Sequence, residues 1–423
     1  MRKRLRPFGG GATGTGIVAG LDLGTAKASC LIARVDAQGT IRVLGSATQA
    51  TKGLRNAAIV DIDGAGHTVA SVVQAAESNA RQKIDSVLVN LSAGQVQSER
   101  VQAAVSVSDR PIGTAELAQV HAITRSRAPQ DGRGLLHLVP LGYAVDGIKG
   151  ARDPRGLFGA TLELETLLIT TPEGVLRTLR TAVGRAHLEV DEVVVSAYAA
   201  GLAVLHPDER ELGVTVVDMG AGSTNVAVFS EGEPVFCDSI PLGGAHITSD
   251  IARGLSTPLS YAERLKTLHG SCLPSTSDDR DLIDLQPIGE AEPGESMHAP
   301  RALLIRIIRA RMEEIFEMVR RSTAATDAGR LAGGAVVLTG GGAQLHGAGE
   351  LAGQVLDKRV RIGRPGGVAG LGEMSDSPSY ATAVGTLLYA QQRQTGGLGS
   401  AVFDLGKPSG VMSRLGSLLR IAR

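Results

Sequence analysis

Two widely separated stretches of this 423-residue chain repeat one pattern. Gly16 to Val35 reads GIVAGLDLGTAKASCLIARV, and Gly213 to Glu231 reads GVTVVDMGAGSTNVAVFSE. In each stretch a short apolar run ends in an aspartate, a turn of small residues follows, and a second apolar run comes after the turn. Short apolar runs bounded by turn residues are typical of buried strands. The repeat predicts two similar halves, each of which begins with a strand hairpin.

Both copies continue in the same way along the chain. In the first copy, a third strand at 41–45 precedes a helix-like segment at 66–83. In the second copy, a strand at 235–240 precedes a helix-like segment at 245–254. Three antiparallel strands followed by helices, used twice, predict an α/β protein with two related lobes.

Composition limits the classes of partner. Lys plus Arg and Asp plus Glu both number 43, so no overall positive field indicates a nucleic-acid ligand. Three cysteines without a CxxC motif and scattered histidines argue against a structural zinc site and fit a reducing cytoplasm. No apolar run reaches the length of a transmembrane helix. The basic, Gly-rich start at 1–16 lacks the apolar core of a signal peptide, and we expect it to be disordered.

Turns of small residues follow three of the predicted strands. They consist of Asp22, Gly24, Thr25, Ala26 and Lys27; of Asp218, Gly220, Gly222, Ser223 and Thr224; and, after a strand at 334–338, of Gly340, Gly341, Gly342 and Ala343. Such turns point several backbone N–H groups at one place and let phosphates approach closely. Lys27 adds a charge for a terminal phosphate, while Asp22 and Asp218 supply carboxylates for a Mg²⁺ ion held largely through water. These features predict a ligand that carries phosphates, and ordinary hairpin turns are the less favoured alternative.

Two other phosphate-binding motifs are excluded. Gly14 to Ala19 fits the GxGxxA dinucleotide pattern, but this segment precedes a strand instead of following one, and it opens no helix. The chain has no GxxxxGK(S/T) segment, which excludes P-loop chemistry.

Three motifs carry a family resemblance. GLDLGTAK at 20–27 and VDMGAGST at 217–224 resemble the two phosphate motifs of the actin/Hsp70/hexokinase superfamily, and LTGGGA at 338–343 resembles its adenosine motif. Within that superfamily the chain most resembles the FtsA family of bacterial cell division proteins. The supporting segments are GTAK at 24–27, IPLGG at 240–244, AERLK at 262–266, RMEEIFE at 311–317 and GGGAQL at 340–345.

The resemblance covers nearly the whole chain and implies an actin-like two-lobed fold, built from duplicated ribonuclease-H-like halves, with an inserted α+β subdomain called 1C. It implies ATP with Mg²⁺ as the ligand and places Gly243, Glu263 and Lys266 near the nucleotide. It also implies that Ser196 to Leu205 and Tyr380 to Gln391 are the two connecting helices at the hinge.

The stretch between the two copies is longer than one lobe needs. We predict strands at 86–91, 101–107, 135–145 and 161–170 and a helix at 114–127. An alternative is that these elements enlarge the first lobe. A compact insertion is favoured because a strand at 165–171 and a helix at 172–187 resume the α/β alternation of the lobe. After the second copy we expect a helix at 260–269, a solvated acidic loop at 270–299 and a helix at 301–323.

The resemblance divides the chain as follows: a tail at 1–16, a first lobe (IA) at 17–93 with 164–205 and 378–391, subdomain 1C at 94–163, a second lobe (IIA) at 206–262 with 334–377, subdomain IIB at 263–333, a Gly-rich linker at 392–409, and a terminal helix at 410–423.

The terminal helix is predicted to be amphipathic. Its apolar residues fall within an arc of about 120° of a helix, and basic residues accompany them. The membrane-facing set is Val411, Met412, Leu415, Leu418 and Leu419, with Arg414 and Arg420 as the basic residues. From the residues alone, docking on the protein itself or on a partner protein is as good an interpretation as membrane binding. The resemblance favours the inner membrane, although the aromatic residue common in such anchors is missing.

The resemblance implies a function as well as a fold. It implies an ATP-binding protein that polymerises on the inner membrane at the septum, tethers FtsZ filaments, and recruits later divisome proteins through subdomain 1C. A single short anchor binds weakly, and polymerisation would add avidity. ATP turnover is expected to be slow at most, and no catalytic residue is assigned. A PilM-like pilus-assembly ATPase and, less favoured, a small-molecule kinase of the same fold remain alternatives.

Overall fold

The computed structural model describes residues 16–92, 95–108, 110–128, 132–288 and 297–394. Most of the predicted tail at 1–16, most of the predicted linker at 392–409 and the whole amphipathic helix at 410–423 lie outside the described residues. The chain forms two compact units. Described residues of 16–99, 132–137 and 167–391 make the first unit, and those of 100–128, 138–166 and 392–394 make the second.

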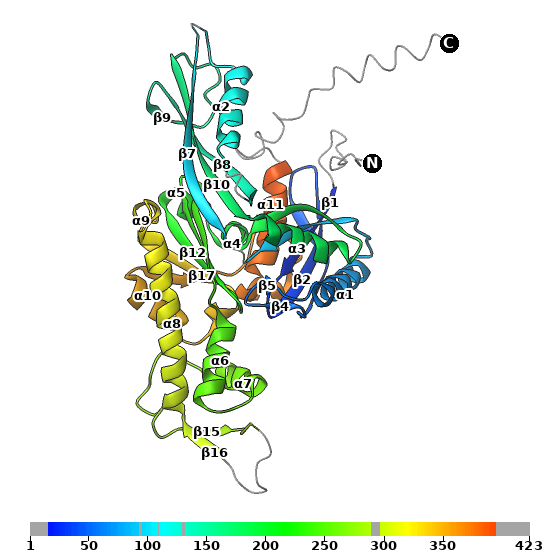
Figure 1. The fold of residues 1–423 in the computed structure, drawn as a ribbon, viewed down its shortest axis with the longest axis vertical. Helices are drawn as coiled ribbons and strands as arrows, with labels where there is room; N and C mark the ends of the chain where they lie inside the picture. The colour runs from blue at the N-terminus through cyan, green and yellow to red at the C-terminus, as the bar shows by residue number, and fades with distance from the viewer. Residues whose placement is uncertain (1–15, 93–94, 109, 129–131, 289–296, 395–423) are drawn as a thin grey trace, which may run out of the picture. The chain divides into compact units, whose positions relative to one another are not determined.

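The first unit contains two five-stranded sheets of the same design (Figure 1). The first-lobe sheet has the order β11-β6-β1-β2-β3 and the second-lobe sheet the order β14-β13-β12-β17-β18. Both sheets contain the three antiparallel strands that the repeat predicted. In each, two parallel strands that the repeat did not predict extend the sheet. The strands are β1 Gly16–Leu23, β2 Lys27–Val35, β3 Ile41–Ala50, β6 Ser86–Leu91 and β11 Glu189–Val195, then β12 Val214–Met219, β13 Thr224–Ser230, β14 Glu233–Ile240, β17 Ala335–Thr339 and β18 Arg359–Ile362.

Helices cover these sheets. In the first lobe, α1 (Ile62–Ala80) lies against β2 and β3, and α3 (Glu173–Gly184) lies against α1 and β11 (Figure 1). Helix α1 begins earlier than predicted because the Asp61 side chain caps it by accepting from the N–H groups of Asp63 and Gly64. The second-lobe helices are α5 Pro207–Leu212, α6 Gly244–Gly254, α7 Leu259–His269, α8 Arg301–Ala324, α9 Ala328–Leu331 and α10 Ala348–Leu356.

Two buried helices lie where connecting helices were predicted. They are α4 (Ser196–Val204) and α11 (Ala381–Gln394). They cross so closely that a Cβ on Gly385 would lie 1.7 Å from the Ala199 carbonyl oxygen. Only a residue without a side chain permits this backbone contact. The helices are therefore present as predicted, while their role as a hinge stays a prediction.

The second unit is an α+β subdomain. Its sheet has the order β7-β10-β8-β9 and carries one helix, α2 (Thr114–Ser126). The strands are β7 Gln97–Ser106, β8 Arg133–Val145, β9 Ile148–Ala151 and β10 Thr161–Pro172. Leu117 and Val120 of α2 share a core with Leu162 and Leu164 of β10. The predicted insertion thus has a core of its own.

Two predictions about the chain between the copies and after them were wrong. Residues 165–171 do not resume the first-lobe sheet, because the single strand β10 runs through them and belongs to the four-stranded sheet. The lobe's own further strand is β11. The segment 270–299 is not simply a solvated loop. It contains a hairpin of β15 (Leu282–Leu285) and β16 (Met297–Pro300), and the Asp278 side chain is buried.

Within the described residues, no helix is both long enough and apolar enough to span a bilayer.

Candidate functional site

The two Asp-Gly turns have the same hydrogen bond. The Gly24 N–H donates to the Lys27 carbonyl at 3.0 Å, and the Gly220 N–H donates to the Ser223 carbonyl at 2.9 Å. Each turn follows a buried aspartate, Asp22 near the end of β1 or Asp218 near the end of β12. The repeat seen in the sequence is therefore also a repeat in backbone geometry, and it presents two equivalent turns to one space.

That space is a cavity of about 740 Å³ in the first unit, a size common for small-molecule sites. Its lining includes most of the residues predicted for the phosphate and nucleotide site: Asp22, Gly24, Thr25, Ala26, Lys27, Asp218, Gly220, Gly222, Ser223, Glu263, Lys266, Gly340, Gly341 and Gly342. The cavity therefore brings together segments that lie hundreds of residues apart in the chain.

Three predicted residues are not among those that line the cavity, and each lies next to residues that do. The Thr224 hydroxyl donates to the Leu242 carbonyl at 2.9 Å. Gly243 lies against the second turn, where a Cβ would be 2.5 Å from the Gly220 carbonyl oxygen. Ala343 is buried within the short 3-10 turn Gly341–Gln344.

Gly340 joins the third turn to Asp218. Its φ of +83° lies in the left-handed region, and a Cβ there would be 2.5 Å from the Oδ1 atom of Asp218. Both observations require glycine at this position. The third turn is thus fixed directly against the buried carboxylate of the second.

The turns of the two lobes also touch each other. A Cβ on Gly222 would lie 2.3 Å from both the Thr25 Oγ1 atom and the Ala57 nitrogen. The Thr25 hydroxyl accepts a hydrogen bond from the Ala57 N–H at 2.8 Å. Ala57 lies between the short strands β4 (Leu54–Arg55) and β5 (Ala58–Ile59), a hairpin that sequence analysis missed.

The buried environment of the two aspartates disfavours their charged forms. Burial raises the pKa of Asp22 to about 7, with a further contribution from the Asp218 charge, while Lys27 opposes the shift. Burial also raises the pKa of Asp218 to about 6, although a hydrogen bond from the Thr382 hydroxyl opposes it. A cation between the carboxylates would relieve this repulsion.

The donor set fits one kind of cation. Among the residues that the structure describes, no group of three or more His, Cys, Asp or Glu side chains could hold a metal. Mg²⁺ is commonly held by one or two carboxylates together with waters and phosphates. Asp22 and Asp218 could therefore hold Mg²⁺ largely through water, whereas a site built wholly from protein ligands does not fit.

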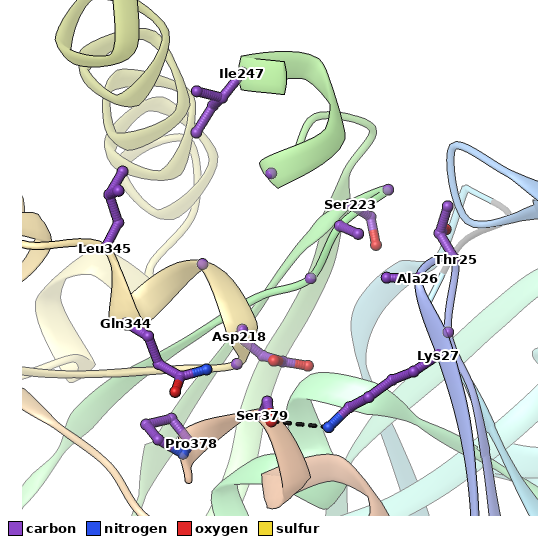
Figure 2. A pocket seen from close by; sticks show the side chains of 18 of the residues that line it. Thr25, Ala26, Lys27, Asp218, Ser223, Ile247, Gln344, Leu345, Pro378 and Ser379 are labelled. Carbon is purple, nitrogen blue, oxygen red and sulfur yellow. Dashed lines mark hydrogen bonds between the residues drawn. The ribbon is translucent and has the colours of Figure 1, made fainter. Parts of the chain in front are cut away.

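Lys27 contacts a segment that was not predicted as part of the site. Its Nζ atom donates to the Ser379 Oγ atom at 2.8 Å and lies 3.4 Å from the centre of the Tyr380 ring. Figure 2 shows the side chain of Lys27 extending towards Ser379, with Asp218 nearby. Burial lowers the pKa of Lys27, and the Asp22 charge opposes that change. The Ser-Pro-Ser run before the last predicted helix was the available signal, since such residues often begin helices.

Glu263 and Lys266 form a bonded cluster at another part of the lining. The Lys266 Nζ atom lies 2.7 Å from Glu263 Oε2, 2.9 Å from Thr248 Oγ1 and 3.1 Å from the Gly244 carbonyl oxygen. The Thr248 hydroxyl also hydrogen-bonds to Glu263. The Glu263 carboxylate is therefore paired with the Lys266 ammonium group and hydrogen-bonded to Thr248.

Arg301 was another missed lining residue. Its Nη1 atom pairs with the buried Asp278 carboxylate at 2.6 Å, and its Nε donates to the His269 carbonyl at 2.9 Å. This pair explains why Asp278 is not solvated. The remaining lining residues that the motifs did not indicate include Ile247, Leu268, Gln344, Leu345 and His346.

A polar network that includes the lining residues Ser92 and Ser223 connects the lobes. Asn90 accepts from the Leu23 N–H at 2.7 Å and donates to the hydroxyls of Ser92 and Ser196. The Ser92 carbonyl then accepts from the Ser223 hydroxyl at 2.8 Å. Ser92 thus bonds to the first lobe through its side chain and to the second lobe through its backbone.

Comparison with known sequences gives a consistent result. The family described as "Cell division protein FtsA" matches residues 215–385, and the family "SHS2 domain inserted in FTSA" matches residues 93–170. The cell division protein FtsA of Rhizobium meliloti (strain 1021) is 39% identical over 416 residues, which is 96% of this chain and 94% of the relative.

Solved structures agree on the fold. A PilM-PilN type IV pilus biogenesis complex matches with a TM-score of 0.63 at 18% identity, over 88% of this chain and 98% of the matched chain. MreB 5 of Spiroplasma citri bound to AMPPNP matches with a TM-score of 0.54 at 14% identity, over 90% and 97%. At these identities the likeness shows the fold alone.

Proposed function

Because this chain belongs to the FtsA family of bacterial cell division proteins, we propose that its cavity binds ATP with Mg²⁺. The observation that carries the proposal is the pair of matched turns, each behind a buried aspartate, facing one cavity of about 740 Å³. The solved MreB 5 structure has AMPPNP bound, which supports an adenine nucleotide as the ligand of a protein with this fold. In this arrangement the turn N–H groups bind phosphates and the two aspartates orient the hydrated ion.

Cavity carboxylates argue against a small-molecule kinase. The acidic residues that line the cavity are Asp22, Asp218 and Glu263. A kinase needs a carboxylate base free to meet its acceptor hydroxyl. Asp22 and Asp218 are assigned to the metal, and Glu263 is bonded to Lys266 and Thr248. ATP binding coupled to conformation, with slow turnover at most, fits these residues better than phosphoryl transfer to a small acceptor.

Calorimetric titration with ATP and Mg²⁺ tests the nucleotide site. We expect Gly340→Ala to abolish detectable binding, because its Cβ would displace Asp218 and strain the backbone. Gly366→Ala is the matched control, since a Cβ there would meet nothing within 4 Å. Unchanged ATP affinity in a folded Gly340→Ala protein would overturn the assignment.

We also propose a cellular role that is more specific than membership of the family. In this proposal the protein polymerises on the cytoplasmic face of the inner membrane, tethers FtsZ filaments at the septum and recruits later divisome proteins through subdomain 1C. The relative from Rhizobium meliloti supports this role over PilM-like pilus assembly. The amphipathic pattern at 410–423 supports the membrane contact.

Co-sedimentation with anionic phospholipid vesicles tests the anchor. We expect the full chain to pellet with vesicles and a chain that ends at residue 409 to remain in the supernatant, with the same ATP affinity. Leu415→Glu in the full chain should reproduce the loss, because a charge on the apolar face opposes insertion. Equal pelleting of the truncated and full chains would refute the anchor while leaving the ATP proposal intact.

A further inference from the structure

The strand that leads into the inserted subdomain is bonded to the second lobe near its start. Ser92 directly follows the first-lobe strand β6, and its carbonyl oxygen lies 2.8 Å from the Ser223 hydroxyl and 2.9 Å from the Ser239 hydroxyl. Ser223 belongs to the second phosphate turn, and Ser239 lies on β14. At Ser92 the chain therefore gains contacts to the second lobe while its side chain still bonds to the first.

Ser98, near the start of β7, strengthens that attachment. Its hydroxyl donates to the Cys237 carbonyl at 2.8 Å and accepts from the Cys237 N–H at 3.0 Å. Cys237 lies on β14, which is an edge strand of the second-lobe sheet. A single side chain thus satisfies both Cys237 backbone groups on the side of edge strand β14 that faces away from β13.

A second strand of the same subdomain is rooted in the first lobe. His137 on β8 accepts from the Val195 N–H at 3.1 Å through Nε2, and its Nδ1 lies 3.2 Å from the Tyr389 hydroxyl. The Tyr389 hydroxyl donates to Glu192 at 2.9 Å. These partners belong to β11 and α11.

We call the attachment at Ser98 the β7 root and the attachment at His137 the β8 root. We propose that these two roots together form a device that converts rotation between the lobes into shear of the inserted sheet. The β7 root moves with the second lobe through the Ser98 hydroxyl, and the β8 root moves with the first lobe through His137. Ser92, which bonds to both lobes, lies where the chain passes from the first lobe towards β7. Both strands flank β10 in one sheet, so displacement of one root against the other must be absorbed inside that sheet. Ser223 both lines the cavity and bonds to Ser92. A phosphate bound at Ser223 would therefore act on this hydrogen bond directly.

The proposal rests on the proposed function only for what drives the rotation, namely ATP with Mg²⁺. The attachment of the roots can be measured without nucleotide. The alternative is that Ser98 only covers the edge of β14. In that case, movement of the lobes would leave the inserted sheet unchanged.

Distance measurements between spin labels on the full chain test the device. The native cysteines Cys30, Cys237 and Cys272 are buried, so introduced surface cysteines can be labelled selectively. One pair joins Leu212→Cys to Ile148→Cys, two exposed sites near the second-lobe sheet and in the inserted subdomain. A second pair joins Leu212→Cys to Gln38→Cys and reports lobe movement alone.

Without nucleotide, we expect Ser98→Ala to broaden the 212–148 distribution. Loss of both hydrogen bonds should raise the population with a detached root by roughly five- to thirtyfold. Ser98→Thr keeps the hydroxyl and should restore the narrow distribution, which separates detachment from a folding defect. Ser106→Ala, at the other end of β7, is the matched control and should leave the distribution unchanged.

With ATP and Mg²⁺, we expect both distances to shift in the protein with Ser98. In Ser98→Ala the 212–38 shift should remain and the 212–148 shift should be lost. Two results would overturn the proposal. One is an ATP-induced shift of the 212–148 distance in Ser98→Ala that equals the shift in the parent. The other is a 212–148 distribution in Ser98→Ala that is no broader than that of the parent without nucleotide. Failure to bind ATP by calorimetry would instead refute the proposed function and, with it, nucleotide as the driver.

Discussion

The Lys27 Nζ atom lies 2.8 Å from the Ser379 hydroxyl, although the two residues are 352 positions apart in the sequence. The contact joins the turn after β1 to the 3-10 turn Pro378–Tyr380, which immediately precedes α11. Helix α11 in turn crosses α4 at Gly385. A phosphate that attracts the ammonium group must compete with Ser379 and with the Tyr380 ring. In the proposed function, Lys27 would therefore link phosphate binding at the turn to the segment that leads into α11.

Replacement of Lys27 by Met should weaken ATP binding by about tenfold or more, because one charge-assisted hydrogen bond contributes about 1.5–3 kcal/mol. Lys52→Met, an exposed lysine outside the cavity lining, is the control and should bind as the parent does. Fluorescent-nucleotide titration measures both. Equal losses in the two variants would mean that general charge, and not this ammonium group, attracts the ligand.

Removal of the Asp22 charge should change stability and binding in opposite directions. The Asp22 carboxylate is buried beside Asp218, so Asp22→Asn at pH 8 should raise the melting temperature of the nucleotide-free protein. The same variant should lose Mg²⁺-dependent ATP affinity because one metal-orienting carboxylate is gone. Calorimetry and thermal unfolding measure the two effects. A lower melting temperature would show that the charge is compensated in the folded protein.

A methyl group on Gly385 should destabilise the first unit by about 1–3 kcal/mol through overpacking of α11 against α4. The added Cβ would lie 1.7 Å from the Ala199 carbonyl oxygen, so the helices must move apart. Gly174→Ala in α3 is the matched control, since its Cβ would meet nothing within 4 Å and helical alanine is favoured over glycine by about 0.5–1 kcal/mol. Urea unfolding distinguishes the two; a neutral Gly385→Ala would refute the close contact.

Acid should destabilise the inserted subdomain through His121. Burial, with a contribution from Arg125, lowers the pKa of His121 from 6.5 to about 4. Its Nε2 atom lies 2.7 Å from the Tyr143 hydroxyl, and no described residue bonds to its buried Nδ1 atom. The neutral ring is therefore the form that the folded subdomain favours.

The sign follows from the lowered pKa. Stability is fully present above pH 6.5 and is lost as the pH falls from 6.5 towards 4, by about 3 kcal/mol at 1.36 kcal/mol per pKa unit. Hydrogen exchange of α2 amides across this range measures the loss. In His121→Gln the acid-dependent part should disappear; if it persists, other groups titrate.

The sequence predicted the repeated part of the fold because the repeat is local. Asp22 and Asp218 each end an apolar run, and the turn residues follow within a few positions. The inserted subdomain was recognised, but β10 was misassigned, because local pattern cannot say which sheet a strand joins. Residues 161–165 alternate between polar and apolar, and an apolar run follows at 167–169, a pattern that suits either sheet.

Most of the candidate site followed from motifs, and the rest depended on long-range packing. Ser379 and Thr382 reach the cavity only because α11 folds back onto the lobes. Asp278 is buried because it pairs with Arg301. No spacing rule in the sequence indicates that pairing. Ala57 was missed because its strands are only two residues long, too short for a periodicity.

The contact of Gly222 with Thr25 and Ala57 leaves no room for a side chain where the two lobes meet. On that side of the cavity, the Gly222 backbone faces the Thr25 hydroxyl and the Ala57 main chain across the lobes. Any larger residue at position 222 would therefore hold the lobes apart. Such a substitution would weaken every ligand that must touch both lobes at once, whatever the chemistry of the ligand.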